Sequence, residues 1–137
     1  MYGPVADSRL QVASWMVGSL ARPCLLVLPR QLAFDERTLL GHCRVSVFDL
    51  AHQTLPEAVR DQRLQAAAGE RRYLLFPSFG YDARKPAAAK RASAWNASID
   101  RIGPIELLHA NGQQLVLVNY GSIELGSPRM RLYRLPN

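Results

Sequence analysis

Basic and aromatic side chains are interleaved along one segment of this sequence, between residues 71 and 91. Cations neutralise phosphates and aromatic faces stack on bases, so this combination is typical of proteins that hold single-stranded nucleic acid. The candidate contacts are Arg71, Arg72, Tyr73, Phe79, Tyr81, Arg84, Lys85, Lys90 and Arg91. The competing interpretation is that Tyr73 and Phe76 are core residues of a strand and Phe79 anchors the loop, while the charges only keep that loop solvated.

Residues 77–91 show no apolar periodicity, which predicts a long loop. Long loops in compact domains are commonly functional or disordered, so this loop is the first place to look for a binding surface. Its aromatic side chains also suit the docking of a protein partner, because aromatic residues and arginine are enriched at the centres of interfaces.

Arginines recur at the C-terminal end of the chain, over residues 129–135. They alternate with Met130, Leu132 and Leu135, and this alternation predicts an edge strand with a basic face. Arg129 and Arg131 could then contact a phosphate backbone, and the edge could instead pair with a protein partner. Edge strands also carry charge simply to prevent sheets from aggregating.

Other chemistries lack their usual spacing. The two cysteines and three histidines form no CxxC, HxxxH or HExxH pattern, so we predict no metal site and no cofactor. His42 and Cys43 are adjacent, but adjacency does not make them a catalytic pair, because neighbouring residues of a strand point to opposite faces. No GxSxG, GxxxxGK[ST] or GxGxxG motif occurs, so we predict no catalytic residues and favour a non-enzymatic function.

The charge of the chain favours an anionic partner. The formal net charge is +6, and the excess lies in the second half, where residues 69–137 hold ten basic and five acidic groups. A positive surface potential attracts phosphate-rich surfaces such as DNA or RNA. Fifteen of the seventeen basic residues are arginine, which a GC-rich genome would also produce.

Length and composition predict one globular domain over residues 1–137, since domains of about 100 to 150 residues are the commonest. With only two cysteines we expect reduced thiols, and the N-terminus lacks the basic start and apolar centre of a signal peptide. The longest apolar run, residues 24–28, is far shorter than the roughly 20 residues that span a bilayer. We therefore expect a cytoplasmic protein that does not enter a membrane.

The predicted elements are those of an α+β fold, with two helices packed on a mixed or antiparallel sheet and a C-terminal β-meander. Helices are expected over residues 8–20 and 54–69, a buried central strand over 24–28, and further strands over 44–49 and 71–76. Residues 95–102 suggest an irregular strand, and the Asn111-Gly112 pair predicts a tight hairpin turn between residues 105 and 118.

These observations favour a non-enzymatic accessory domain that binds DNA or RNA through the basic and aromatic loop. One alternative is a structural or adaptor subunit of a larger bacterial or phage assembly, which docks through residues 77–91 or the strand at 129–135. Another is a small enzyme or ligand sensor with an unrecognised pocket, in which His42, His52 or His109 takes part.

Overall fold

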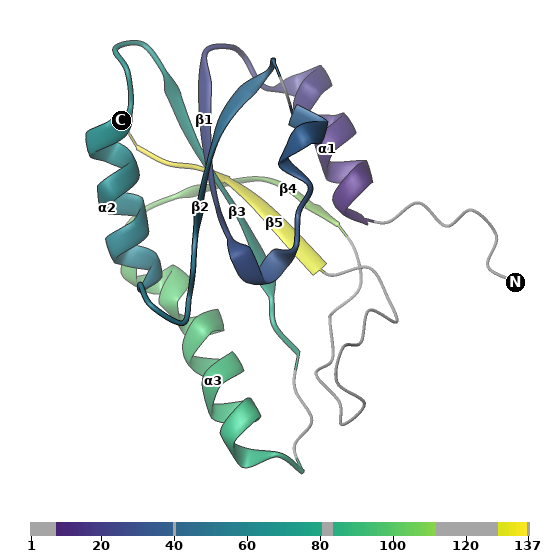
Figure 1. Ribbon diagram of the computed structural model, residues 1–137, viewed down its shortest axis with the longest axis vertical. Coiled ribbons are helices and arrows are strands. Elements are labelled where there is room, and N and C mark those ends of the chain that lie inside the picture. The colour runs from purple at the N-terminus through teal and green to yellow at the C-terminus, as the bar shows by residue number, and fades with distance from the viewer. Residues whose placement is uncertain (1–7, 40, 81–83, 112–128, 137) are drawn as a thin grey trace, which may run out of the picture.

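In the computed structural model, helices flank a single mixed β-sheet (Figure 1). The structure describes residues 8–39, 41–80, 84–111 and 129–136. In chain order the elements are α1 (Ser8–Ser19), β1 (Cys24–Pro29), the short 3-10 helices η1 (Arg30–Leu32) and η2 (Glu36–Leu39), β2 (Cys43–Phe48), α2 (Leu55–Gln65), β3 (Arg71–Ser78), α3 (Pro86–Ala97), the 3-10 helix η3 (Ser98–Arg101), β4 (Glu106–Asn111) and β5 (Arg129–Arg134).

The five strands lie in the order β2-β1-β3-β5-β4. β1 pairs in parallel with both β2 and β3, whereas β5 is antiparallel to both β3 and β4. The step from β1 to β2 and the step from β2 to β3 run in opposite directions across the sheet. Right-handed crossovers in opposite directions must lie on opposite faces, and this places α2 on the other side of the sheet from η1 and η2.

The sheet separates two hydrophobic cores. On one face, α1 packs through Met16 against Leu26 and Leu28 of β1, together with η1 and η2. On the other face, α2 and α3 cover Val27 of β1 and Leu74 of β3. All six residues of β1 are buried, which confirms the prediction of a central strand.

The prediction of a long loop over residues 77–91 is wrong, because α3 begins at Pro86 and continues to Ala97. The irregular strand expected over residues 95–102 is also wrong, since those residues complete α3 and form η3. Alanine has the highest helix propensity and proline suits a first helical turn, so composition favours a helix that apolar periodicity does not reveal. The described residues therefore form three α-helices where we expected two.

The C-terminal strand is not at an edge. β5 lies between β3 and β4, with Met130 and Leu132 fully buried, and β4 is the outer strand. Because both sides of β5 are already paired, it has no open edge on which a partner strand could add. The predicted turn at Asn111-Gly112 lies outside the described residues.

The two cysteines form a disulfide between β1 and β2, so the expectation of reduced thiols is wrong for this structure. Cys24 and Cys43 are opposite each other in the register of these two parallel strands, which brings their side chains within bonding distance. Neither the spacing of the two residues in the sequence nor their number revealed this pairing. Among the helices that the described residues form, none is long and apolar enough to cross a membrane.

A bidentate ion pair joins β2 to the residue before β3. Arg44 donates to both oxygens of Glu70, from Nε at 2.8 Å and from Nη2 at 2.6 Å, and the backbone NH of Ala67 donates to the same carboxylate. The hydrogen bond from Arg44 is the main reason that the pKa of Glu70 lies below its ordinary value. Burial of the carboxylate opposes this effect without reversing it.

Glu70 is expected to contribute stability that depends on pH. Since its pKa is lower in the folded state, this contribution is present above the pKa of the unfolded chain and is lost as the pH falls through the folded pKa. Urea unfolding should find Glu70→Gln less stable than wild type by about 1 kcal/mol at pH 7, with the difference shrinking as the pH falls below the ordinary pKa of a glutamate and through the lower pKa of Glu70 in the folded protein.

The matched control is Asp35→Asn. Asp35 pairs with Arg37 in the same way, and that hydrogen bond lowers its pKa, but both side chains are exposed. Exposed pairs contribute little to folding, so this variant should unfold like wild type at every pH. A Glu70 variant with wild-type stability at pH 7 would show that the Arg44–Glu70 pair does not contribute to the free energy of unfolding.

Candidate nucleic-acid interface

The structure divides the predicted contact residues into buried and exposed groups. Arg72, Tyr73 and Phe79 lie in the interior with 5%, 4% and 3% of their surface exposed. None of these three side chains has the free face that stacking on a base requires. Tyr81 lies outside the described residues, and Arg71 is exposed at the first position of β3.

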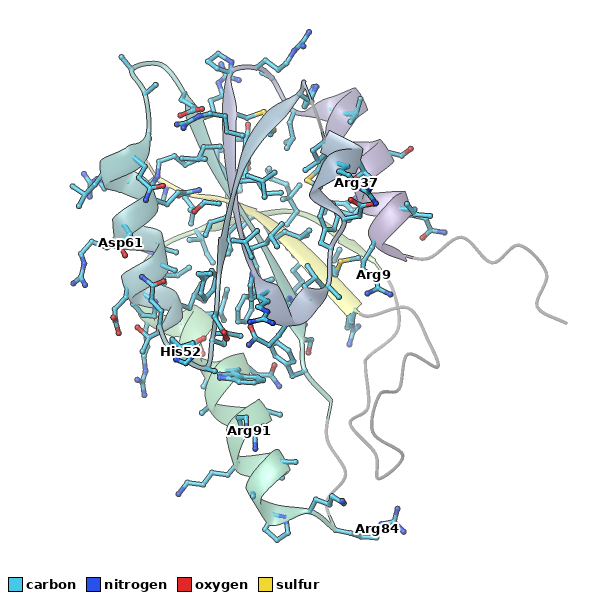
Figure 2. The ribbon with its side chains drawn as sticks, in the orientation of Figure 1. Arg9, Arg37, His52, Asp61, Arg84 and Arg91 are labelled. Carbon is cyan, nitrogen blue, oxygen red and sulfur yellow. A yellow bond between two sulfur atoms is a disulfide. The ribbon has the colours of Figure 1, made fainter. Side chains whose placement is uncertain are left out.

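Four of the exposed cations belong to α3 and the two residues before it. Arg84 and Lys85 directly precede the helix, and Lys90 and Arg91 lie within it. Figure 2 shows Arg84 beyond the first turn of α3, at the end that projects away from the sheet, and Arg91 farther along the helix. We call these four residues the α3 basic surface.

The segment that carries the α3 basic surface has a positive formal charge. Residues 84–99 contain four cations and no acidic residue. The residue that precedes the helix, Lys85, makes no capping hydrogen bond through its side chain. The first backbone NH groups of a helix have no intrahelical acceptor and add partial positive charge at the same end.

Two reciprocal hydrogen bonds fix α3 to the end of β3. The side-chain NH₂ of Asn96 donates to the carbonyl of Phe79 at 2.8 Å, and the NH of Phe79 donates to Asn96 Oδ1 at 2.7 Å. Below them, Phe79 packs on Trp95 with ring centroids 4.9 Å apart, and Ala92 is fully buried. The helix that carries the cations is therefore held by specific contacts along its second half.

Trp95 is an aromatic residue of α3 that lies beside one of its cations. The guanidinium of Arg91 lies 6.0 Å from the centroid of the Trp95 ring, at the outer limit of a cation–π contact, and Trp95 is only partly buried. We placed Trp95 in a strand and did not include it among the contacts. A helical reading of residues 86–97 would have put positions 91 and 95 on one face.

The chain has no match among known proteins. No family model, no curated protein and no solved structure is similar to it at a significant level. The function proposed below is therefore argued from the chemistry of the described surface.

Two of the three β5 arginines, Arg129 and Arg131, lie on the face of the sheet that α3 covers. Arg131 pairs with Phe76 of β3 and borders a small cavity of about 30 Å³ together with Asn96 and Ile99. Arg129 pairs with Ser78, two positions closer to the strand end. These arginines therefore lie near the second half of α3, whereas Arg71 is at the opposite end of β3.

The histidines of the enzyme alternative lie in three separate places. Nε2 of His42 is 2.9 Å from the carbonyl of Leu20, His109 stacks on Trp15, and His52 is exposed 3.7 Å from Asp49. A groove of about 320 Å³ follows the end of β1, but no histidine lines it.

Asp49, the residue after β2, links the ends of β1 and β2 through hydrogen bonds. Its carboxylate accepts hydrogen bonds from Gln31 Nε2 at 2.6 Å and from the NH of Ala51 at 2.9 Å. The bond from Gln31 is the largest cause of its lowered pKa. The carboxylate of Asp49 therefore links the segments that follow β1 and β2.

Proposed function

We propose that this chain is a non-enzymatic nucleic-acid-binding domain and that the α3 basic surface contacts phosphates. The observation that carries the proposal is the set of four exposed cations, two on α3 and two directly before it, with no acidic residue between positions 84 and 99. Binding a phosphate backbone there would release condensed counterions, which is the main source of affinity in sequence-independent recognition. Trp95 beside Arg91 would offer part of a ring face to a base.

The deciding experiment is a fluorescence anisotropy titration with labelled single-stranded and double-stranded oligonucleotides at two salt concentrations. The test variant replaces Lys85, Lys90 and Arg91 with alanine. Removing three phosphate contacts should weaken binding at low salt by about tenfold or more and reduce the log–log salt slope by about 2 for single strands. Because all three side chains are exposed, the melting temperature should not change.

A matched control replaces Arg60 and Arg63, two exposed arginines of α2, with alanine. This variant should bind oligonucleotides almost as well as wild type. Losses in proportion to the three and two charges removed would indicate a response to net charge alone, and an absence of wild-type binding at low salt would exclude the proposal.

A protein-binding role is the second candidate, and α1 carries the observation that favours it. Leu10 and Val17 are 56% and 46% exposed and are seven residues apart, so they lie on one face of the helix. An interface centred on such apolar side chains would weaken little with ionic strength, unlike contacts to phosphate.

A cytoplasmic location is part of the first proposal, and the disulfide bears on it. Disulfides persist in oxidising compartments, whereas cytoplasmic thiols are usually kept reduced. In the cytoplasm we therefore propose that Cys24 and Cys43 are largely present as thiols.

A further inference from the structure

Three side chains that commonly ligate metals meet where β1 and β2 begin. One potential ligand atom from each of Cys24, His42 and Cys43 lies within 4.8 Å of the other two. Both cysteines are buried, with 2% and 9% of their surface exposed, and His42 is partly buried. This cluster is separate from the α3 basic surface and plays no part in the proposed function.

The turn before β2 sets the position of His42. It precedes the first residue of β2, so the alternation of faces that we expected to separate it from Cys43 does not apply. A tight turn at Gly41, with φ of 81°, leads into it, and the NH of His42 bonds to the carbonyl of Leu39 at 2.9 Å.

The hydrogen bond of the imidazole selects its tautomer. Nε2 lies 2.9 Å from the carbonyl oxygen of Leu20, and a carbonyl can only accept. In the neutral ring Nε2 therefore carries the proton, and Nδ1 keeps its lone pair. Histidines that ligate metals generally donate their second nitrogen to a carbonyl or carboxylate in this manner.

We propose that the reduced form of this cluster binds one zinc-like cation through Cys24 Sγ, Cys43 Sγ and His42 Nδ1. Two equivalents of a small cellular thiol reduce the disulfide, leave two protein thiols and are themselves joined as a disulfide. Binding of M²⁺ then displaces one proton from each thiol. Two thiolates and an imidazole suit zinc, which takes four tetrahedral ligands, and water would fill the fourth position.

The required movement is small. Two sulfurs bound to one tetrahedral zinc lie about 3.7 Å apart, given zinc–sulfur distances of about 2.3 Å. Cys24 and Cys43 are direct neighbours on paired strands, with Cα atoms 4.7 Å apart, so rotation of the side chains can provide this separation. The cation would then replace the disulfide as the link between β1 and β2.

The experiment is a cobalt(II) titration of the full chain under argon, after reduction with a phosphine. We expect one cobalt per chain, with thiolate-to-cobalt charge-transfer bands and the visible bands of a tetrahedral site. Added zinc(II) should bleach these bands. Zinc(II) should also raise the melting temperature of the reduced protein and leave that of the oxidised protein unchanged, because only the folded reduced form offers the complete site.

Three variants separate this site from adventitious binding. Cys43→Ser should abolish the charge-transfer bands, and His42→Ala should weaken cobalt binding by about tenfold or more. His52→Ala removes an exposed histidine outside the cluster and should bind like wild type. If His42→Ala binds as wild type does, the three-residue site is excluded.

The state of the reduced protein is checked by circular dichroism before each titration. If reduction unfolds the chain, zinc(II) should restore the folded spectrum in wild type and fail to do so in His42→Ala. Absence of cobalt bands in a folded reduced protein, or of refolding by zinc in an unfolded one, would overturn the proposal.

Discussion

Replacing Arg72 with methionine is expected to lower the free energy of unfolding by about 3 kcal/mol. Arg72 donates to Gln62 Oε1 at 3.0 Å, to the carbonyl of Val59 at 2.9 Å and to the carbonyl of Pro136 at 2.6 Å. It therefore joins β3 to α2 and to the end of the chain. Methionine can fill the space of the stem but leaves the buried Gln62 oxygen without this donor.

The burial of Arg72 limits the size of the effect. Desolvation lowers the pKa of its guanidinium, which means that the fold bears a cost for holding this charge inside. Removing the charge recovers part of that cost, so the loss is smaller than three buried hydrogen bonds alone would imply. Chemical denaturation measures the difference directly.

Arg71→Met is the matched control for Arg72. Arg71 is the preceding residue of the same strand and its side chain is exposed, so its replacement should change the stability by no more than about 0.5 kcal/mol. Equal stability of the Arg72 variant and wild type would mean that apolar packing fully compensates for the lost network.

Reduction of the disulfide is expected to destabilise the metal-free protein by a similar amount. Cys24 and Cys43 are 19 residues apart, and closing a loop of that length stabilises a fold by about 3 kcal/mol through the entropy of the unfolded chain. Urea unfolding with and without a phosphine reductant, in the presence of a chelator, measures this contribution.

A variant that lacks both cysteines provides the control. Cys24→Ala combined with Cys43→Ala should unfold at the same urea concentration with and without the reductant. A wild-type midpoint that does not respond to reduction would show that the link between β1 and β2 contributes nothing to stability.

The elements with strong local signals were predictable from the sequence. β1 is an uninterrupted apolar run bounded by prolines, and this pattern is enough to predict a strand that is buried on both faces. α2 starts as expected, with Thr54 Oγ1 accepting a hydrogen bond from the NH of Glu57, and Thr54 donates in turn to the Glu57 carboxylate. Such a cap involves residues only three positions apart, so it can be predicted from the local sequence alone.

α3 and the position of β5 depend on information that is not local. In α3, alanines on the buried and exposed sides look alike, so no periodicity marks the face that packs on the sheet. The alternation in residues 129–135 correctly predicts a strand. Alternation indicates which side chains lie on the same face of a sheet, but not which strands pair with this one. Only the pairing with both β3 and β4 makes β5 an interior strand.

The sequence predicted which residue types the candidate interface contains, but not which of these residues are exposed and which are buried. Arg71 and Arg72 are identical in type and adjacent, yet one is exposed while the other is held inside by Gln62 of α2. No pattern in residues 71–91 indicates that an amide on another helix will accept from this arginine. We predicted a loop for all the cations of the α3 basic surface, whereas Lys90 and Arg91 lie in α3.

The paired hydrogen bonds between Asn96 and Phe79 have a consequence for how this domain opens. They resemble one rung of a β-ladder in which a side-chain amide takes the place of a neighbouring strand, so the end of β3 and the second half of α3 form one cooperative unit. A local fluctuation that frees the helix must also expose Phe79 and the core beneath it. A ligand that binds the docked helix would therefore slow amide exchange at Phe79 and at the adjoining end of β3, even though it never touches the sheet.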